Sequence, residues 1–179
     1  NNLLIHPEKE AIVHWVAGEE PFRWTFANLL RTAETVAFQL KKLGIRENDV
    51  CAIIIRHNKY FYPLYLGIAL SGAIPAVLAY PNPRIHPEKY RQGISGMSQR
   101  SGLDYIFTEE EIDKIIRPLI DAEESTIKNM YFPLKWDLER TISGKENLEL
   151  HESFSKILPD NPVLLQHSSG TTGLQKPVV

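Results

Sequence analysis

The residues with the clearest chemistry lie near the end of the chain, where an apolar run gives way to small hydroxylic side chains. The segment Ser168-Ser169-Gly170-Thr171-Thr172-Gly173-Leu174-Gln175-Lys176 places four hydroxyls, two glycines and one lysine within nine positions. Glycines let the backbone approach a ligand closely, and successive N–H groups in such a loop can form an anion-binding concavity. Lys176 adds a mobile positive charge that suits phosphate. The pattern predicts a loop that binds the phosphates of a nucleotide.

The same composition also suits an ordinary polar loop after a buried strand, because Gly, Ser and Thr cluster in such loops. The segment does not match a Walker A motif, in which Gly-Lys-Ser/Thr follows four spacer residues. Lys176 instead follows Gln175 and precedes Pro177. The spacing therefore argues against a P-loop NTPase and leaves the phosphate loop and the plain polar loop as alternatives.

Strands and helices alternate along the chain that leads to this loop. The sequence predicts a hairpin with strands at 11–18 and 22–25, then an amphipathic helix that Thr25 caps and Gly44 ends. Further strands are expected at 50–55, 74–80, 104–107, 130–132 and 163–166, and further helices at 60–73 and 87–100. Thr108 is expected to cap one more helix, with Glu109–Glu111 in its first turn. The order predicts an α/β fold, a mostly parallel sheet flanked by helices after an opening β-hairpin.

Two features inside this pattern have competing interpretations. His57-Asn58 follows the apolar run 50–55, at the strand end where open α/β sheets bind ligands, and it suits either loop capping or ligand contact. The segment from Lys59 to Arg84 has no charge between its ends and is long enough to cross a bilayer. Its internal prolines and Ser71-Gly72 break it, which favours a buried helix and strand over a membrane span.

Composition restricts the class of protein. The chain has 179 residues, a net charge of −2 and a hydrophobic content of 43%, values that suit one soluble domain or one and a part. No basic excess points to nucleic acid as a partner. One cysteine and six scattered histidines show no metal-ligand spacing. Cys51, the only cysteine, can form no intrachain disulfide, so a reduced, cytoplasmic setting is expected.

The terminal segment also resembles a known signature, the Ser/Thr-Ser-Gly-Thr-Thr-Gly-x-Pro-Lys-Gly motif of the adenylate-forming superfamily. Thr25 with its helix, and the segment 67–77, are similar to two further family segments, although Asn28 stands where Glu is usual. The likeness covers about residues 10 to 179. It implies that residues 1–179 are a partial, N-terminal AMP-binding domain and a fragment, with the C-terminal domain of the catalytic lysine absent. Gln175 and Pro177 replace the usual Pro and Gly, and Pro177 restricts Lys176 towards extended conformations.

The resemblance implies a ligase related to acyl-CoA synthetases and fatty acyl-AMP ligases. Such an enzyme activates a carboxylic acid with ATP as an acyl-adenylate and passes the acyl group to a thiol, of CoA or of a phosphopantetheine carrier protein. By the same likeness, Ser168, Ser169, Gly170, Thr171, Thr172, Gly173 and Lys176 contact the phosphates, and Mg²⁺ is carried on them. No catalytic residue of the family falls within 1–179, so the fragment alone is expected to be inactive. A non-catalytic nucleotide- or partner-binding module on the same fold is the alternative.

Overall fold

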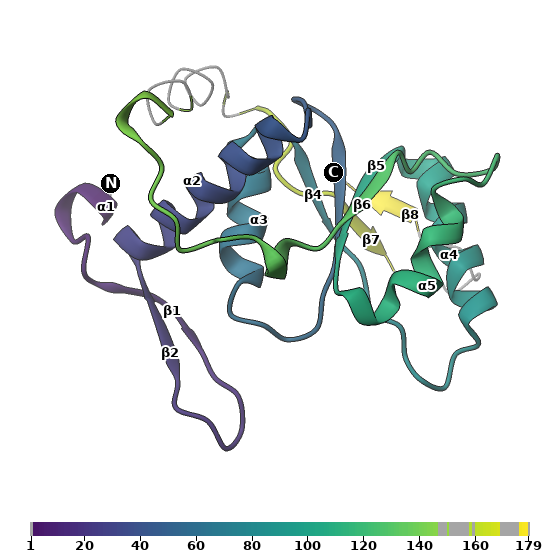
Figure 1. Ribbon diagram of the computed structural model, residues 1–179, viewed down its shortest axis with the longest axis horizontal. Coiled ribbons are helices and arrows are strands. Elements are labelled where there is room, and N and C mark those ends of the chain that lie inside the picture. Colours follow the sequence, from purple (N-terminus) through teal and green to yellow (C-terminus); the bar gives the residue numbers. More distant parts are fainter. Residues whose placement is uncertain (1, 147–149, 151–157, 159, 169–175, 179) are drawn as a thin grey trace.

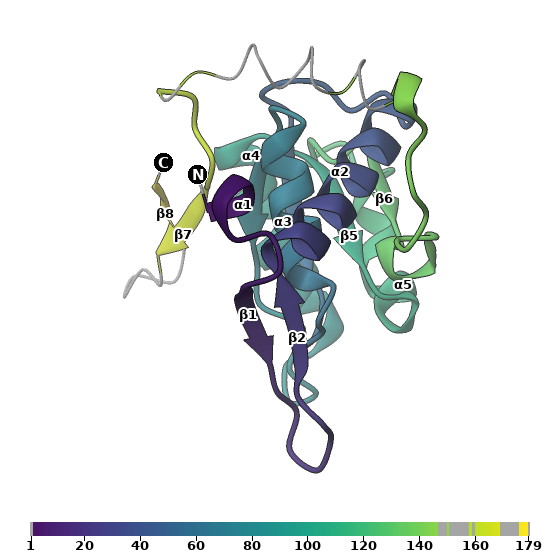
Figure 2. The ribbon, with the colours of Figure 1, turned by 90° about the vertical axis from the view of Figure 1, so that its left-hand side faces the viewer.

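A hairpin near the start of the chain projects from one end of the molecule (Figures 1 and 2). The computed structural model describes residues 2–146, 150, 158, 160–168 and 176–178. After a short helix α1 (Asn2–Ile5), strands β1 (Glu10–His14) and β2 (Phe22–Thr25) pair antiparallel. The predicted hairpin is confirmed. Its first strand is shorter than expected because a turn, closed by Glu19 N–H on the Val16 carbonyl, follows soon after.

Helix α2 (Phe26–Lys42) forms as its pattern predicts. The Thr25 hydroxyl accepts a hydrogen bond from the Asn28 N–H at 3.2 Å, which satisfies one of the free donors of the first turn. Lys41 and Lys42 lie in the last turn, where the helix dipole favours cations. The chain leaves the helix through Gly44 at a φ of 79°, a conformation that glycine adopts without steric cost.

A parallel sheet follows, with its strands in the order β4-β3-β5-β6. The strands are β3 (Val50–Ile54), β4 (Ile74–Val77), β5 (Leu103–Thr108) and β6 (Asn129–Tyr131). All five residues of β3 are buried, as a continuous apolar run in the middle of a two-sided sheet predicts. The predicted α/β architecture is confirmed.

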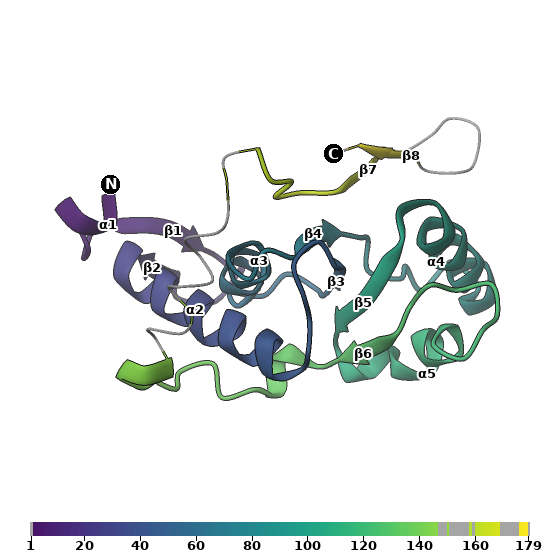
Figure 3. The same ribbon diagram turned by 90° about the horizontal axis from the view of Figure 1, so that it is seen from above.

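Helices cover both faces of the sheet (Figure 3). Helices α2 and α3 (Phe61–Leu70) lie on one face, and α4 (Pro87–Ser101) and α5 (Asp113–Ile116) lie on the other. Alternate strand residues face the two layers: Cys51 and Ile53 pack with the α2–α3 side, and Ala52 and Ile54 with the α4–α5 side. The uncharged stretch after Lys59 thus forms α3 and β4, and no helix in the described part of the chain is long and apolar enough to cross a membrane.

The prediction of a helix capped by Thr108 is wrong in the residue at which the helix starts and in the residue that caps it. Thr108 is the last residue of β5, and its hydroxyl donates to the Ile54 carbonyl at 2.7 Å instead of capping a helix. Glu109 has no helix-capping bond, because its carboxylate binds Arg56. Helical structure starts with the 3₁₀ turn η1 (Glu110–Ile112), continues in α5 and ends in a second 3₁₀ turn, η2 (Arg117–Leu119).

The last predicted strand is also displaced. Of residues 163–166, Leu165 forms an isolated parallel bridge with Ala76, while Val163 and Leu164 are exposed. Strand β7 spans Gln166–Ser168 and pairs antiparallel with β8 (Lys176–Val178). Before it, the structure places a 3₁₀ turn, η3 (Pro133–Lys135), and helical residues 144–146.

Candidate functional site

The predicted phosphate loop starts at the end of β7 and returns at the start of β8. Ser168 and Lys176 are partners in the register of this hairpin, so the backbone at the two ends of the loop lies side by side. Lys176 is in extended conformation, as the following Pro177 predicts. Ser169, Gly170, Thr171, Thr172 and Gly173 lie outside the described residues. Their contact with phosphate, like that of Ser168 and Lys176, stays a prediction.

The segment that leads into the loop is fixed to the edge of the sheet. The Leu165 N–H donates to the Pro75 carbonyl at 2.9 Å, which continues the sheet beyond β4 in the parallel sense. Two residues earlier, the Val163 carbonyl accepts from the Tyr65 hydroxyl of α3 at 3.1 Å. Figure 3 shows the resulting hairpin beside β4 and α4. The loop therefore follows a strand at the carboxyl edge of the sheet, where open α/β sheets bind ligands.

A side-chain contact holds the other face of the hairpin. His167 Nε2 and Ser101 Oγ share a hydrogen bond of 2.7 Å, which joins β7 to the last residue of α4. His167 Nδ1 is buried and has no hydrogen-bond partner within the described residues. Burial lowers the pKa of His167, so the ring is neutral at pH 7. Sequence reasoning missed this residue, although its position directly before Ser168 was a usable signal.

A charged cluster joins the carboxyl ends of three strands. Glu109, only 9% exposed, accepts from the Arg56 backbone N–H at 2.6 Å and from Arg56 Nε at 2.9 Å. The same guanidinium lies 3.2 Å from Glu111 and 5.1 Å from the centre of the Tyr80 ring. Glu110 pairs with Lys135 instead. The positive charge of Arg56 is thus paired with the carboxylates of Glu109 and Glu111. All three acids of the run 109–111 form ion pairs.

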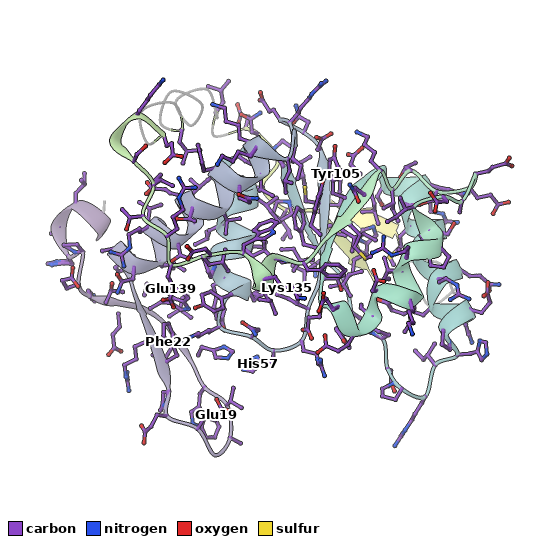
Figure 4. All side chains as sticks on the ribbon, in the orientation of Figure 1. Glu19, Phe22, His57, Tyr105, Lys135 and Glu139 are labelled. Atoms are coloured by element: carbon purple, nitrogen blue, oxygen red, sulfur yellow. The ribbon has the colours of Figure 1, made fainter. Side chains whose placement is uncertain are left out.

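The pair His57-Asn58 serves the loop after β3. Asn58 Oδ1 accepts from the Tyr60 N–H at 2.9 Å, which confirms the capping interpretation for Asn58. The His57 ring stacks on His14 of β1 with centroids 4.1 Å apart, and its Nε2–H donates to the Trp15 carbonyl at 3.1 Å. Figure 4 shows the side chain of His57 beside the hairpin, to which Phe22 and Glu19 belong. These contacts tie the hairpin to the carboxyl end of β3.

An apolar cavity of about 470 Å³ lies between α4 and the loop that follows β4. Its walls include Tyr80, Tyr90, Ile94 and Met97. The Tyr90 hydroxyl donates to the Ala79 carbonyl at 2.7 Å, and burial raises the pKa of Tyr90.

Within the described residues, no group of three or more His, Cys, Asp or Glu side chains is placed to hold a metal ion.

Comparison with known proteins settles the family. The profile of the family described as "AMP-binding enzyme" matches residues 3–179. The chain belongs to the AMP-binding enzyme family. Among relatives of this family, a fatty acid–[acyl-carrier-protein] ligase, ScoC of Streptomyces coeruleorubidus, is 28% identical over 156 residues, which are 87% of this chain and 27% of that protein. Human long-chain fatty acid transport protein 1 is 37% identical over 181 residues, with 97% of this chain and 26% of that protein covered.

The fold agrees with that of solved AMP-binding enzymes. A fatty acyl-adenylate ligase from L. pneumophila, in complex with acyl adenylate and pyrophosphate, superposes with a TM-score of 0.71 at 18% identity, and the match covers 99% of this chain and 28% of that one. The predicted first part of an adenylate-forming N-terminal domain is confirmed at the level of the fold. The chain spans little more than a quarter of the relatives it matches.

Proposed function

We propose that the chain is part of an ATP-dependent ligase that activates a carboxylic acid as an acyl-adenylate and transfers the acyl group to a thiol, of CoA or of a phosphopantetheine carrier protein. Membership of the AMP-binding enzyme family over residues 3–179 is the observation that carries this proposal. The relatives include a fatty acid–carrier-protein ligase, 4-coumarate–CoA ligases and an acetyl-coenzyme A synthetase. A fatty acid is our first choice of substrate class within the carboxylic acids.

The loop from Ser168 to Lys176 is proposed to bind the phosphates of ATP. Negative charge accumulates on the β- and γ-phosphates as pyrophosphate leaves, and preorganised N–H groups, hydroxyls and a cation stabilise such charge. The backbone pairing of Ser168 with Lys176 supports this role, because it holds the two ends of the hydroxyl-rich segment side by side. Magnesium, when bound, would take its oxygen ligands mainly from the phosphates and offset their charge.

The 179 residues alone are proposed to bind nucleotide without forming acyl-adenylate. The motifs that carry the family resemblance in this chain do not include the family's catalytic lysine or its ribose-binding segment. The 179 residues are therefore expected to bind nucleotide but not to catalyse adenylation of a carboxylic acid. Turnover would require a catalytic lysine and a ribose-binding segment in addition to the groups named here.

Equilibrium titration of the chain with ATP and with pyrophosphate tests the loop. Lys176→Gln is expected to weaken binding of both ligands by about ten-fold or more, since a charge-assisted contact to phosphate is lost. Lys9→Gln makes the same change of net charge at an exposed position near the N-terminus and serves as the matched control. Equal effects of the two substitutions, or no binding of either ligand, would contradict the proposal.

An exchange assay separates the enzyme from the alternative. Pyrophosphate–ATP exchange is measured with decanoate, 4-coumarate and acetate, for the 179-residue chain and for the longest native form of the protein. Exchange by the longer form alone is expected. Nucleotide binding without exchange by either form would favour a non-catalytic nucleotide-binding module.

A further inference from the structure

Among the residues whose side chains the structure describes, the β7–β8 hairpin is anchored to the α4 layer by the 2.7 Å hydrogen bond between His167 and Ser101. Its other described anchors, the Pro75–Leu165 and Tyr65–Val163 contacts, lie upstream of β7 and hold the segment to β4 and α3. The anchor at His167 is immediately adjacent to Ser168, and His167 is the register partner of Pro177. A rotation or shift of β7 at this point would therefore move both ends of the phosphate loop.

The surroundings of His167 favour a neutral ring. His167 borders a cavity of about 450 Å³ whose other walls are Phe61, Tyr65, Val77, Leu164, Leu165 and Gln166. None of these residues is charged, and α4 contributes the uncharged Ser101. The second ring nitrogen, Nδ1, is buried without a partner in the described part of the chain. Protonation would place a cation at a site where no carboxylate among these neighbours can compensate it.

We propose that His167 is a positioning residue for phosphate binding, acting through Ser101 to fix the backbone of Ser168 and Lys176 relative to α4. The inference rests on the proposed function, because the phosphates are those of ATP. Burial of Nδ1 without a described partner favours the neutral imidazole in this role. Since small displacements of a binding group reduce its contribution, loss of this anchor weakens phosphate binding without removing any group that touches the ligand.

Three variants test the anchor: His167→Phe removes the hydrogen bond, Ser101→Ala removes its partner, and His167→Gln keeps a hydrogen-bonding group that does not titrate. Ser95→Ala is the matched control, because Ser95 lies on the same helix and its hydroxyl donates to the Glu124 carbonyl at 3.2 Å. At pH 8, His167→Phe and Ser101→Ala are each expected to weaken ATP binding about five-fold, the equivalent of one hydrogen bond. The double variant should be no weaker than either single variant, and Ser95→Ala should bind as the native chain does.

A pH series distinguishes positioning by the neutral ring from a merely structural contact. The ratio of ATP affinity in the native chain to that in His167→Gln is measured from pH 8 to pH 5.5, so that the titration of ATP itself cancels. Because burial of the ring in the anchored form favours neutral His167, this ratio is expected to fall as the pH drops below the ordinary imidazole value near 6.5. A flat ratio, or additive losses in the double variant, would overturn the inference.

Hydrogen exchange keeps the inference separate from the proposed function. The amides of residues 165–168, Lys176 and Val178 are expected to exchange faster in His167→Phe and Ser101→Ala, while those of 50–54 are unchanged. If the amides exchange faster in the variants but the native chain binds no ATP, the proposed function and the phosphate role of His167 are both rejected. The His167–Ser101 bond would then only stabilise the hairpin. Normal ATP binding by the native chain, with unchanged affinity in both variants, would reject the inference alone. If His167→Phe does not fold, Ser101→Ala gives the same comparison.

Discussion

At Gly67, α3 packs directly against Val36 and Ala33 of α2, and this position offers a sharp test of how the helical layer is packed. A Cβ atom at Gly67 would lie 2.5 Å from Val36 Cβ and 2.7 Å from the Ala33 carbonyl oxygen. Carbon atoms in ordinary contact are about 3.5–4.0 Å apart, so the helices would have to separate by about 1 Å. A change of rotamer could move Val36 Cγ1, which would lie 2.6 Å away, but it moves neither the Val36 Cβ nor the Ala33 carbonyl oxygen.

Gly67→Ala is therefore expected to lower the free energy of unfolding by about 3 kcal/mol, at the upper end of the usual cost of overpacking. For a chain of this size, that corresponds to a fall in Tm of about 6–12 °C. Urea denaturation followed by tryptophan fluorescence measures the change. The same residue type offers a matched control in Gly93 of α4, where an added Cβ would meet no atom within 4 Å.

Gly93→Ala should raise stability by about 0.5–1 kcal/mol, because alanine is the better helix former and the site is open. Opposite signs for the two Gly→Ala changes are the expected outcome. A Gly67→Ala chain within 0.5 kcal/mol of the native one would show that α2 and α3 are not packed as described.

Three further predictions concern groups near the sheet. Glu109→Ala should reduce the free energy of unfolding by about 2–4 kcal/mol, because it leaves the Arg56 N–H and guanidinium without their buried acceptor; chemical denaturation measures it. Thr108→Val should cost about 1 kcal/mol through the lost bond to the Ile54 carbonyl, and an unchanged urea midpoint would contradict it. Burial lowers the pKa of His14, so the unfolded chain binds this proton more readily, and stability should decline as the pH falls below about 6.5. His14→Gln should flatten that decline, and an identical pH profile would refute the assignment.

The elements that local patterns determine were predictable from the sequence. Helix α2 has a regular apolar face and a Thr25 cap, and β3 is a continuous apolar run rich in β-branched residues. Both signals arise within one element, so they can be read without tertiary contacts. The residue types between Ser168 and Lys176 likewise indicated the family without any knowledge of the fold, while their contact with phosphate stays a prediction.

The failures share a physical cause, which is a partner distant in sequence. The acid expected at a helix start, Glu109, is bound by Arg56, which lies 53 positions earlier. The last strand starts later in the sequence than predicted, because Tyr65 of α3 and Ser101 of α4 fix the position of this segment through hydrogen bonds. No local pattern specifies such contacts, and they decide both the end of β5 and the setting of β7.

Pyrophosphate titration of an isotope-labelled chain, followed at the backbone amides by NMR, tests the central claim most directly. The expected result is a set of saturable shifts confined to the amides of residues 168–176 and their neighbours in β7 and β8. The shifts should be lost or shifted to higher ligand concentration in Lys176→Gln. Saturable shifts elsewhere, at Arg56 or Lys89 for example, with none in the loop, would contradict the claim that this segment binds the phosphates of ATP.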